Sequence, residues 1–366
     1  MLYGYLNSPF VSNPFADAAI RPSNVTSPVI SGSGVVGQTL STTDGTWSGT
    51  LPITFAYQWN RNGSIILGAT FNTYTLVTAD ASTSITCTVT ATNAGGSLSK
   101  NSNAISVAAA GDADANAFIA AAAITNTTQK AAIDKLVTDL KGYGIWTKMK
   151  ALYPFVGGTA SQHKFNLKNP LDTDAAFRLV FNGGWTHSSN GALPNGTNAY
   201  ANTFFKGSNW TTKDNCHMSY YSRTNVNGSQ VEIGLYDAGT AFNNSLAVRY
   251  NDSFQSLLNL AGNSGWLLVA NTNSSGQFMA NRNAVNTLNS WKNGVKQGQV
   301  ASTSFTNVFY PTLNYTLGAY NDTGTPAAYS AKQAAFASFG DGLTDTEAAN
   351  YYTAVQTFQT TLSRNV

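Results

Sequence analysis

The stretch FASFGDGLTDTE, residues 336–347, joins a predicted strand to a predicted helix. Its apolar first half is strand-like and breaks into a Gly-Asp-Gly turn. Thr344 and Glu347 have the spacing of a capping box, in which the threonine hydroxyl accepts the Glu347 N–H and the carboxylate reaches back. The residues around and after it place an apolar face at helical spacing: Leu343, Tyr351, Val355, Phe358 and Leu362. Such a helix needs a surface to pack on, and the preceding β segment is the nearest.

Strand-like segments precede this helix through the second half of the chain. They recur at residues 177–181, 217–221, 231–236, 246–250, 276–280 and 312–318. Asn293 and Gly294 follow a strand that contains Trp291, and they are a hairpin signal because both tolerate positive φ. We therefore expect residues 145–366 to form one antiparallel β domain that packs against the terminal helix.

The composition favours a mainly β protein that works outside a cell. Only 10% of the 366 residues are charged, against a usual share of about a quarter, so Asn, Thr, Ser and Gly must supply most of the polar surface. The formal charge of +3 is small and the basic residues form no stripe along the sequence, so we expect no nucleic-acid partner. No run of 18 apolar residues is present, so we expect no membrane span.

Residues 25–108 predict a separate β-sandwich of short strands with turn signals about every 8–12 residues. The segment ITFAYQWN, residues 53–60, alternates and places Phe55, Tyr57 and Trp59 on one face. Asn62-Gly63 is a further hairpin signal.

This segment resembles the immunoglobulin-like modules of bacterial and phage surface proteins. The resemblance rests on VGQTL (36–40), GTW (45–47), YQW (57–59), YTL (74–76) and TNAG (92–95). Trp59 followed by Cys87 also resembles the tryptophan and second cysteine of such sandwiches, although Leu40 occupies the position of the partner cysteine and Ile85 that of the corner tyrosine. The resemblance implies that Trp59 is buried beside Leu40 and Cys87. Cys87 and Cys216 fall in different predicted domains, so we expect two free thiols.

Two further segments complete the predicted organisation. Residues 109–144 favour helices, one through 113–124 and one through 128–140, and we expect them to form a connector between the β domains. Residues 1–24 are aromatic and aperiodic, which suits either a strap on the next domain or an arm that docks to another subunit. We expect a docking arm whose anchors are Tyr3, Tyr5, Phe10 and Phe15.

The C-terminal domain resembles laminin-G-like, concanavalin A-like jelly rolls of phage and bacterial surface proteins. The motifs that carry the resemblance are WKNGV (291–295), LGAYN (317–321), FGDGLTDTE (339–347) and the closing YYTAVQTFQTTLSR (351–364). It covers residues 145–366 and implies a jelly-roll sandwich with a C-terminal helix. That fold hosts lectins, glycosidases, lyases and inert spacers, so it does not fix an activity.

The sequence offers little for catalysis or metal binding. Glycosidases use two carboxylates, yet Glu232 and Glu347 are the only glutamates, and Glu347 is assigned to the capping box. The histidines at 163, 187 and 217 form no metal-binding spacing. Some members of the resembled family bind calcium, but the aspartates that could serve, at 237, 252, 322 and 341, are better read as turn residues. We expect no catalytic residue, no metal and no cofactor.

Loop aromatics are the candidates for ligand binding. Trp185, His187, Trp210 and Trp266 could stack on a sugar, with neighbouring Asn and Ser as polar partners. The alternative is that these large side chains pack in the core or at its rim, and the sequence leaves both readings open.

We expect a non-enzymatic phage structural protein of the virion surface, either a capsid decoration or head fibre or a tail-associated adhesin. It would dock to other virion proteins through its arm, form a homo-oligomer, and bind host or environmental glycans. The N-terminus has no secretory signal pattern, and release by host lysis would explain that. The alternatives are a jelly-roll polysaccharide depolymerase and a bacterial surface adhesin.

Overall fold

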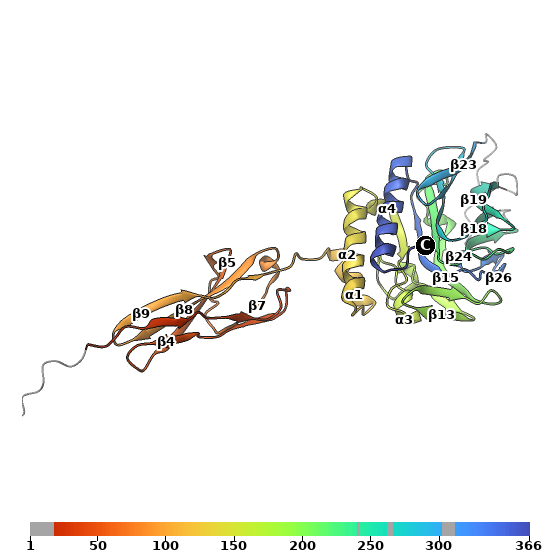
Figure 1. Ribbon diagram of the computed structural model, residues 1–366. Coiled ribbons are helices and arrows are strands. Elements are labelled where there is room, and N and C mark those ends of the chain that lie inside the picture. Colours follow the sequence, from red (N-terminus) through yellow and green to blue (C-terminus); the bar gives the residue numbers. More distant parts are fainter. Residues whose placement is uncertain (1–17, 240–241, 262–265, 302–311) are drawn as a thin grey trace, which may run out of the picture. The chain divides into compact units, whose positions relative to one another are not determined.

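The structure is a computed structural model that describes residues 18–239, 242–261, 266–301 and 312–366. The chain divides into two compact units, Met1–Ala110 and Gly111–Val366 (Figure 1). The predicted anchors Tyr3, Tyr5, Phe10 and Phe15 lie outside the described residues. The predicted mainly β fold class, with packed sheets and a C-terminal helix, is confirmed.

The first unit is built from antiparallel strands. One sheet has the order β10-β8-β5-β6 with β9 beside β8, another has the order β2-β3-β7, and β1 pairs with β4. The bounds are β1 Ser23–Thr26, β2 Ile30–Ser31, β3 Thr39–Thr42, β4 Thr46–Ser48, β5 Thr54–Arg61, β6 Ser64–Ile65, β7 Thr73–Thr75, β8 Ser84–Asn93, β9 Gly96–Asn101 and β10 Ile105–Ser106.

Trp59 is at the centre of this unit's core. It is fully buried in one cluster with Leu40 and Cys87, as expected, and its indole N–H donates to the Phe71 carbonyl at 2.8 Å. Both cysteines are buried, and burial raises the pKa of the Cys87 thiol to about 11.

The end of the predicted arm is attached to the first unit. The Ile20 N–H donates to the Thr50 hydroxyl at 2.9 Å, and the Ile20 carbonyl accepts from the Thr50 N–H at 3.0 Å and from Asn93 Nδ2 at 2.8 Å. Residues 18–24 therefore belong to the unit's own structure, and any free arm must end before them.

Two sheets form the second unit, and their strands pair antiparallel except for the parallel pair of β17 and β25. The eight-stranded sheet contains β13 Trp185–Ser188, β14 Gly191–Pro194, β27 Ala334–Gly340, β16 Cys216–Ser222, β21 Gly276–Arg282, β22 Thr287–Lys292 and β23 Val295–Ala301 in that order, with β11 Met149–Tyr153 beside β27. The nine-stranded sheet contains β12 Val180–Asn182, β15 Tyr200–Lys206, β24 Asn314–Leu317, β17 Ile233–Asp237, β18 Phe242–Tyr250, β19 Ser253–Ala261 and β20 Leu267–Ala270, extended by β25 Tyr320–Asp322 and β26 Thr325–Ala327.

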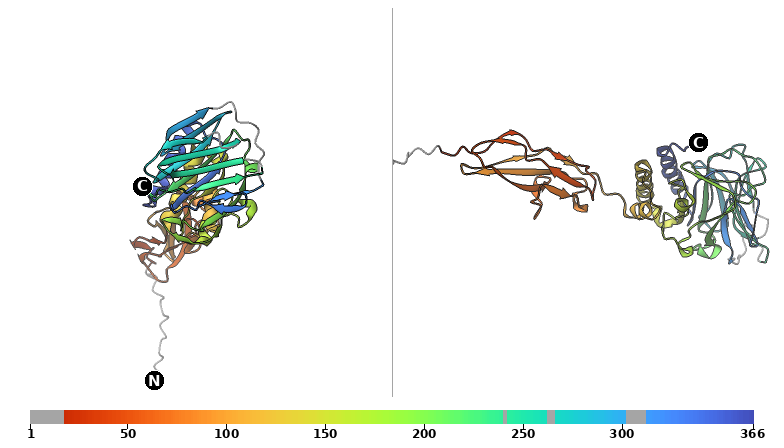
Figure 2. Two further views of the ribbon diagram at one scale, coloured as in Figure 1. Left: turned by 90° about the vertical axis from the view of Figure 1, so that its right-hand side faces the viewer. Right: turned by 90° about the horizontal axis from the view of Figure 1, so that it is seen from below.

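Helices cover one face of the eight-stranded sheet, so this unit has three layers (Figures 1 and 2). Neighbouring side chains on β16 alternate between the layers: Tyr220 lies in the core between the sheets, and Tyr221 lies in the core beneath the helices. The helices are α1 Ala113–Ala121, α2 Thr127–Gly142, α3 Ala160–His163 and α4 Asp345–Thr361. The segment expected as a connector, 109–144, thus supplies α1 and α2 to this unit's core, because their buried stripe packs beside α4.

The local signals of the sequence produce the elements they predict. The Thr344 N–H donates to Glu347 Oε2 at 2.8 Å and the Glu347 N–H to the Thr344 hydroxyl at 3.3 Å, which is the capping box of α4. Asn293 and Gly294 turn with φ of 49° and 74° between β22 and β23. Phe177 departs from the expected strand: it has a φ of 58° at the end of a short 3₁₀ turn, and β12 begins only at Val180.

Candidate functional site

The nine-stranded sheet presents one face to the core and one face away from it. On β17, Ile233 and Leu235 lie in the core between the sheets, whereas Gly234 and Tyr236 point to the other face. Ser245 lies opposite Gly234 in the register and shares that outward face. The left view of Figure 2 looks onto this side of the unit.

A pocket of about 380 Å³ lies on this outward face. Its volume is within the range of small-molecule sites, roughly 300–1,000 Å³. It is lined by Val231, Ser245, Tyr250, Gln255, Trp266, Leu268, Tyr320 and Ala328. These residues come from β18, β19, β20, β25 and the segments beside β17 and β26, so no single stretch of sequence encodes the pocket.

Aromatic and aliphatic side chains supply much of the wall. Tyr250, Trp266 and Tyr320 are each half-buried, and Leu268 is 57% exposed. Partly exposed tryptophan and tyrosine offer a rigid apolar surface with a polar edge, which suits ligands that have both characters.

Tyr320 is held in place from several directions. Its hydroxyl donates to Asn243 Oδ1 at 2.5 Å, and its ring stacks near that of Tyr236, with centroids 6.4 Å apart. A Cβ on residue 234 would lie 2.3 Å from Tyr320 Cδ2, so only glycine allows the ring to approach the strand this closely. Burial, followed by the charge of Asp322, raises the pKa of Tyr320 above its usual value.

Ser245 is the unusual polar group of the pocket. Its side chain is fully buried, and its hydroxyl has no hydrogen-bond partner among the described residues. A buried polar group without a partner costs about 1–3 kcal/mol, and water or a ligand that enters the pocket can supply the missing hydrogen bond. The half-buried amide of Gln255 is a second polar group in the same wall.

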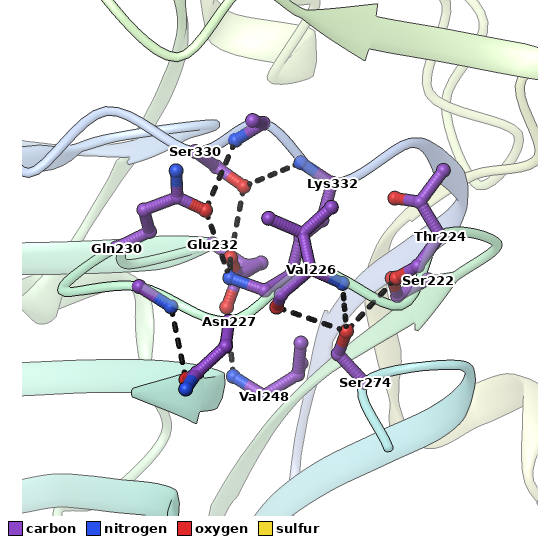
Figure 3. Close-up of polar contacts among 12 residues, drawn as sticks. Ser222, Thr224, Val226, Asn227, Gln230, Glu232, Val248, Ser274, Ser330 and Lys332 are labelled. Carbon is purple, nitrogen blue, oxygen red and sulfur yellow. Dashed lines mark hydrogen bonds and ion pairs between the residues drawn. The ribbon is translucent and has the colours of Figure 1, made fainter. Parts of the chain in front are cut away.

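A buried ion pair begins one residue after Val231 of the pocket lining, at Glu232 (Figure 3). Glu232 and Lys332 are both fully buried, with Lys332 Nζ 3.0 Å from Glu232 Oε1. The same carboxylate oxygen accepts from the Ser330 hydroxyl at 2.8 Å, and Oε2 accepts from the Val248 N–H at 2.7 Å. Gln230 Oε1 also accepts from Lys332 Nζ, at 3.1 Å.

This network connects directly to the pocket. The Val231 N–H donates to the Ala328 carbonyl at 3.0 Å, and both residues line the pocket next to the charged pair. Glu232 therefore joins β18, the start of β17 and the segment that leads into β27. Figure 3 also shows Ser274 accepting from the Val226 N–H, at 2.8 Å, which orders the neighbouring loop.

The four side chains proposed from the sequence are not brought together. Trp266 lines the pocket, but Trp210 is only 4% exposed and packs in the core against Phe205, so it offers no face to a ligand. Trp185 and His187 lie on β13, at the edge of the other sheet, where both pack against Phe181.

His187 also contacts a second histidine. Its Nδ1 lies 2.9 Å from Nδ1 of His163, which is buried. Burial, followed by the charge of His187 and of Arg364, lowers the pKa of His163 to about 3, and burial lowers the pKa of His187 as well. Two imidazoles that share a hydrogen bond at this distance are held neutral near pH 7.

The remaining acidic candidates are in ordinary structural roles. Arg249 pairs with Asp252 at 2.6 Å and Lys150 with Asp341 at 3.4 Å. Asp237 accepts from the Gly239 N–H at 3.0 Å, and Asp322 accepts from the Thr323 hydroxyl at 3.2 Å. Among the described residues, no group of three or more His, Cys, Asp or Glu is placed to hold a metal ion. No helix in the described part of the chain has the length and apolarity needed to cross a membrane.

The sequence matches no protein-family model and no curated protein. Among solved structures, the chain is similar to the CBM40 of Ruminococcus gnavus IT-sialidase bound to α2,3-sialyllactose, with 18% identity, 37% of this chain and 79% of that chain covered, and a TM-score of 0.29. It is also similar to the binding domain of botulinum neurotoxin serotype D, with 11% identity, 57% and 52% covered, and a TM-score of 0.38. NanB sialidase of Streptococcus pneumoniae is 14% identical over 46% of this chain and 27% of that chain, with a TM-score of 0.33. At these scores the similarities carry no argument about what this chain binds.

Proposed function

We propose that the second unit is a glycan-binding module and that the pocket beside Trp266 holds a sugar. The observation that carries the proposal is the combination, in one pocket, of half-buried aromatic rings with the buried hydroxyl of Ser245, which has no partner among the residues that the structure describes. The weak similarities to solved structures are not part of the argument.

A sugar fits both features of the wall. One face of a pyranose ring consists of C–H groups, which pack against the rings of Trp266 and Tyr250, whereas its edge carries hydroxyls. Those hydroxyls both donate and accept, as do the Ser245 hydroxyl and the Gln255 amide. A bound sugar would therefore give the buried serine the partner that it lacks.

The proposed activity is binding without cleavage. Hydrolysis of a glycosidic bond ordinarily uses two carboxylates that flank it. The residues that line the pocket are uncharged. The chain's two glutamates are engaged in structure: Glu232 in the buried pair with Lys332, and Glu347 in the capping box of α4 and an ion pair with Lys148 at 2.6 Å.

The decisive experiment applies the full chain to an array of neutral and acidic glycans. The affinity for each glycan that binds is then measured by titration calorimetry. We expect Trp266→Ala to weaken binding at least about tenfold, which corresponds to roughly 1.4 kcal/mol. Phe71→Ala is the matched control, because it removes an aromatic ring that is 74% exposed in the first unit. Unchanged affinity in Trp266→Ala, or no glycan bound by the unaltered chain, would overturn the proposal.

We also propose that the chain is a structural protein of a phage virion surface, as a capsid decoration or head fibre or as a tail-associated adhesin. The resemblance of its two β units to modules of phage surface proteins supports this. In that setting the N-terminal residues dock to other virion proteins, copies of the chain associate with one another, and the second unit binds glycans. Mass spectrometry of purified virions tests the location, and absence of the chain from intact particles would contradict it.

A further inference from the structure

We propose that the pocket selects uncharged sugars and discriminates against acidic ones, such as uronates and sialylated glycans. The inference rests on the proposed function, because it specifies the ligand class of the same pocket. Its basis is the chemistry of the lining, which combines aromatic rings and aliphatic groups with uncharged polar groups only. These polar groups are the hydroxyls of Ser245, Tyr250 and Tyr320, the Gln255 amide and the Trp266 indole N–H.

An acidic sugar needs a donor that this wall does not present. Proteins recognise carboxylates with charge-assisted hydrogen bonds, most often from arginine, because an ionised group loses strong hydration when it enters a pocket. The residues that line the pocket include no arginine, lysine or histidine. Ser245 and Gln255 can each donate only a neutral hydrogen bond.

Two cations in segments that adjoin the pocket lining are already paired. Arg249 adjoins Tyr250, but its guanidinium contacts Asp252 at 2.6 Å and Asn225 at 2.9 Å. Lys332 is fully buried and is paired with Glu232. Neither is available to a ligand unless it leaves its partner.

The charge next to the pocket has the wrong sign for an acid. Asp322 is exposed two residues after Tyr320 on β25, and its charge contributes to the raised pKa of the Tyr320 hydroxyl. A carboxylate brought to the same ring would meet the same negative potential. A neutral sugar would not.

The three internal segments that the structure does not describe contain no charged residue in their sequence. Residues 240–241 are Thr-Ala, residues 262–265 are Gly-Asn-Ser-Gly, and residues 302–311 read STSFTNVFYP. None of these contains Asp, Glu, Lys, Arg or His. The neutral character of the lining therefore does not depend on where these segments lie.

The test compares pairs of sugars that differ only at C6: the methyl glycosides of glucose, galactose and mannose against the corresponding methyl glycosiduronates. Binding of each to the full chain is followed by NMR titration at pH 7 in low salt. Wherever at least one sugar of a pair binds, we expect the neutral sugar to bind at least about tenfold more tightly than the uronate.

Two variants make the test sharper. Leu268→Arg places a cation at an exposed position of the rim, and Asp322→Asn removes the neighbouring anion. Both variants should raise the affinity for the uronate relative to the affinity for its neutral partner. For Leu268→Arg we expect this ratio to change by about tenfold or more. A matched control, Val285→Arg, adds the same charge at a position that is 69% exposed and outside the pocket lining, and should leave the ratio unchanged.

The outcomes separate this inference from the proposed function. Uronates that bind as tightly as their neutral partners, in a manner that Trp266→Ala abolishes, would overturn the selectivity and leave glycan binding at the pocket in place. If no sugar of either class binds, and none on the array does, both the function and the selectivity fail.

Discussion

Glu232→Gln tests how much the buried ion pair of Glu232 and Lys332 stabilises the second unit. The carboxylate of Glu232 accepts from three donors: Lys332, Ser330 and Val248. An amide has one acceptor oxygen, so at least one of these donors loses its partner, and the Lys332 ammonium remains fully buried without a counter-charge. Breaking a buried pair in this way costs about 3–5 kcal/mol.

The expected loss is large enough to measure by calorimetry. A unit of this size shifts in melting temperature by roughly 2–4 °C per kcal/mol, so the transition of the second unit should fall by about 6–20 °C. Lys332→Met should lower the stability of the second unit by a similar amount, because it leaves the Glu232 carboxylate buried without a counter-charge. The double variant, Glu232→Gln with Lys332→Met, removes both charges and should cost clearly less than the sum of the two single changes.

The control is Lys135→Gln, which breaks a pair with Asp139 in which the lysine side chain is 60% exposed. That change should cost no more than about 0.5 kcal/mol. If Glu232→Gln costs as little as this control, the buried pair does not stabilise the second unit in the way proposed here.

Four further predictions concern other parts of the molecule. Ser245→Ala should weaken glycan binding but leave the second unit at least as stable as before, because it removes a buried hydroxyl that has no partner among the described residues. A clear loss of stability in denaturant titration would show that the hydroxyl already has a partner. Trp59→Ala should destabilise the first unit by about 3–5 kcal/mol, and a change below about 1 kcal/mol would contradict its central place in the core. The pKa values of His217 and His163 are lowered from 6.5 to about 4 and about 3, mainly by burial, so the unfolded chain takes up protons first. Stability should be full above about pH 7 and fall as the pH drops from about 6.5 towards 4, by on the order of 2 kcal/mol per histidine, and equal urea midpoints at pH 7.5 and 4.5 would refute this. Deletion of residues 1–17 should leave both units folded, because the attachment to the first unit begins near Ile20, and should prevent incorporation into virions; normal incorporation would end the docking-arm proposal.

The features that could be predicted are those encoded over a few residues. The capping box at Thr344 and the Asn293-Gly294 hairpin each depend on neighbours in the sequence, and both occur as expected. The alternation around Trp59 likewise specifies which side chains enter the core of the first unit.

The pocket could not be predicted because it is assembled from distant segments. Glu232 and Lys332 are 100 residues apart, and no spacing rule connects them. Trp210 and Trp266 both follow Gly, Ser and Asn, so their sequence contexts look alike. Trp210 is buried in the core between the sheets, whereas Trp266 is half-buried at the edge of the same core and also lines the pocket. Tertiary packing determines which of the two tryptophans is fully buried. The unpartnered hydroxyl of Ser245 is likewise visible only in three dimensions.

The central claim is that a sugar binds on the outward face of the nine-stranded sheet, and a crystal structure of the chain with its best-bound glycan tests it most directly. We expect a sugar ring packed against Trp266, with a hydroxyl within hydrogen-bond distance of Ser245 Oγ and another near Gln255. A sugar found instead beside Trp185 and His187, or anywhere that leaves Ser245 without a partner, would contradict it.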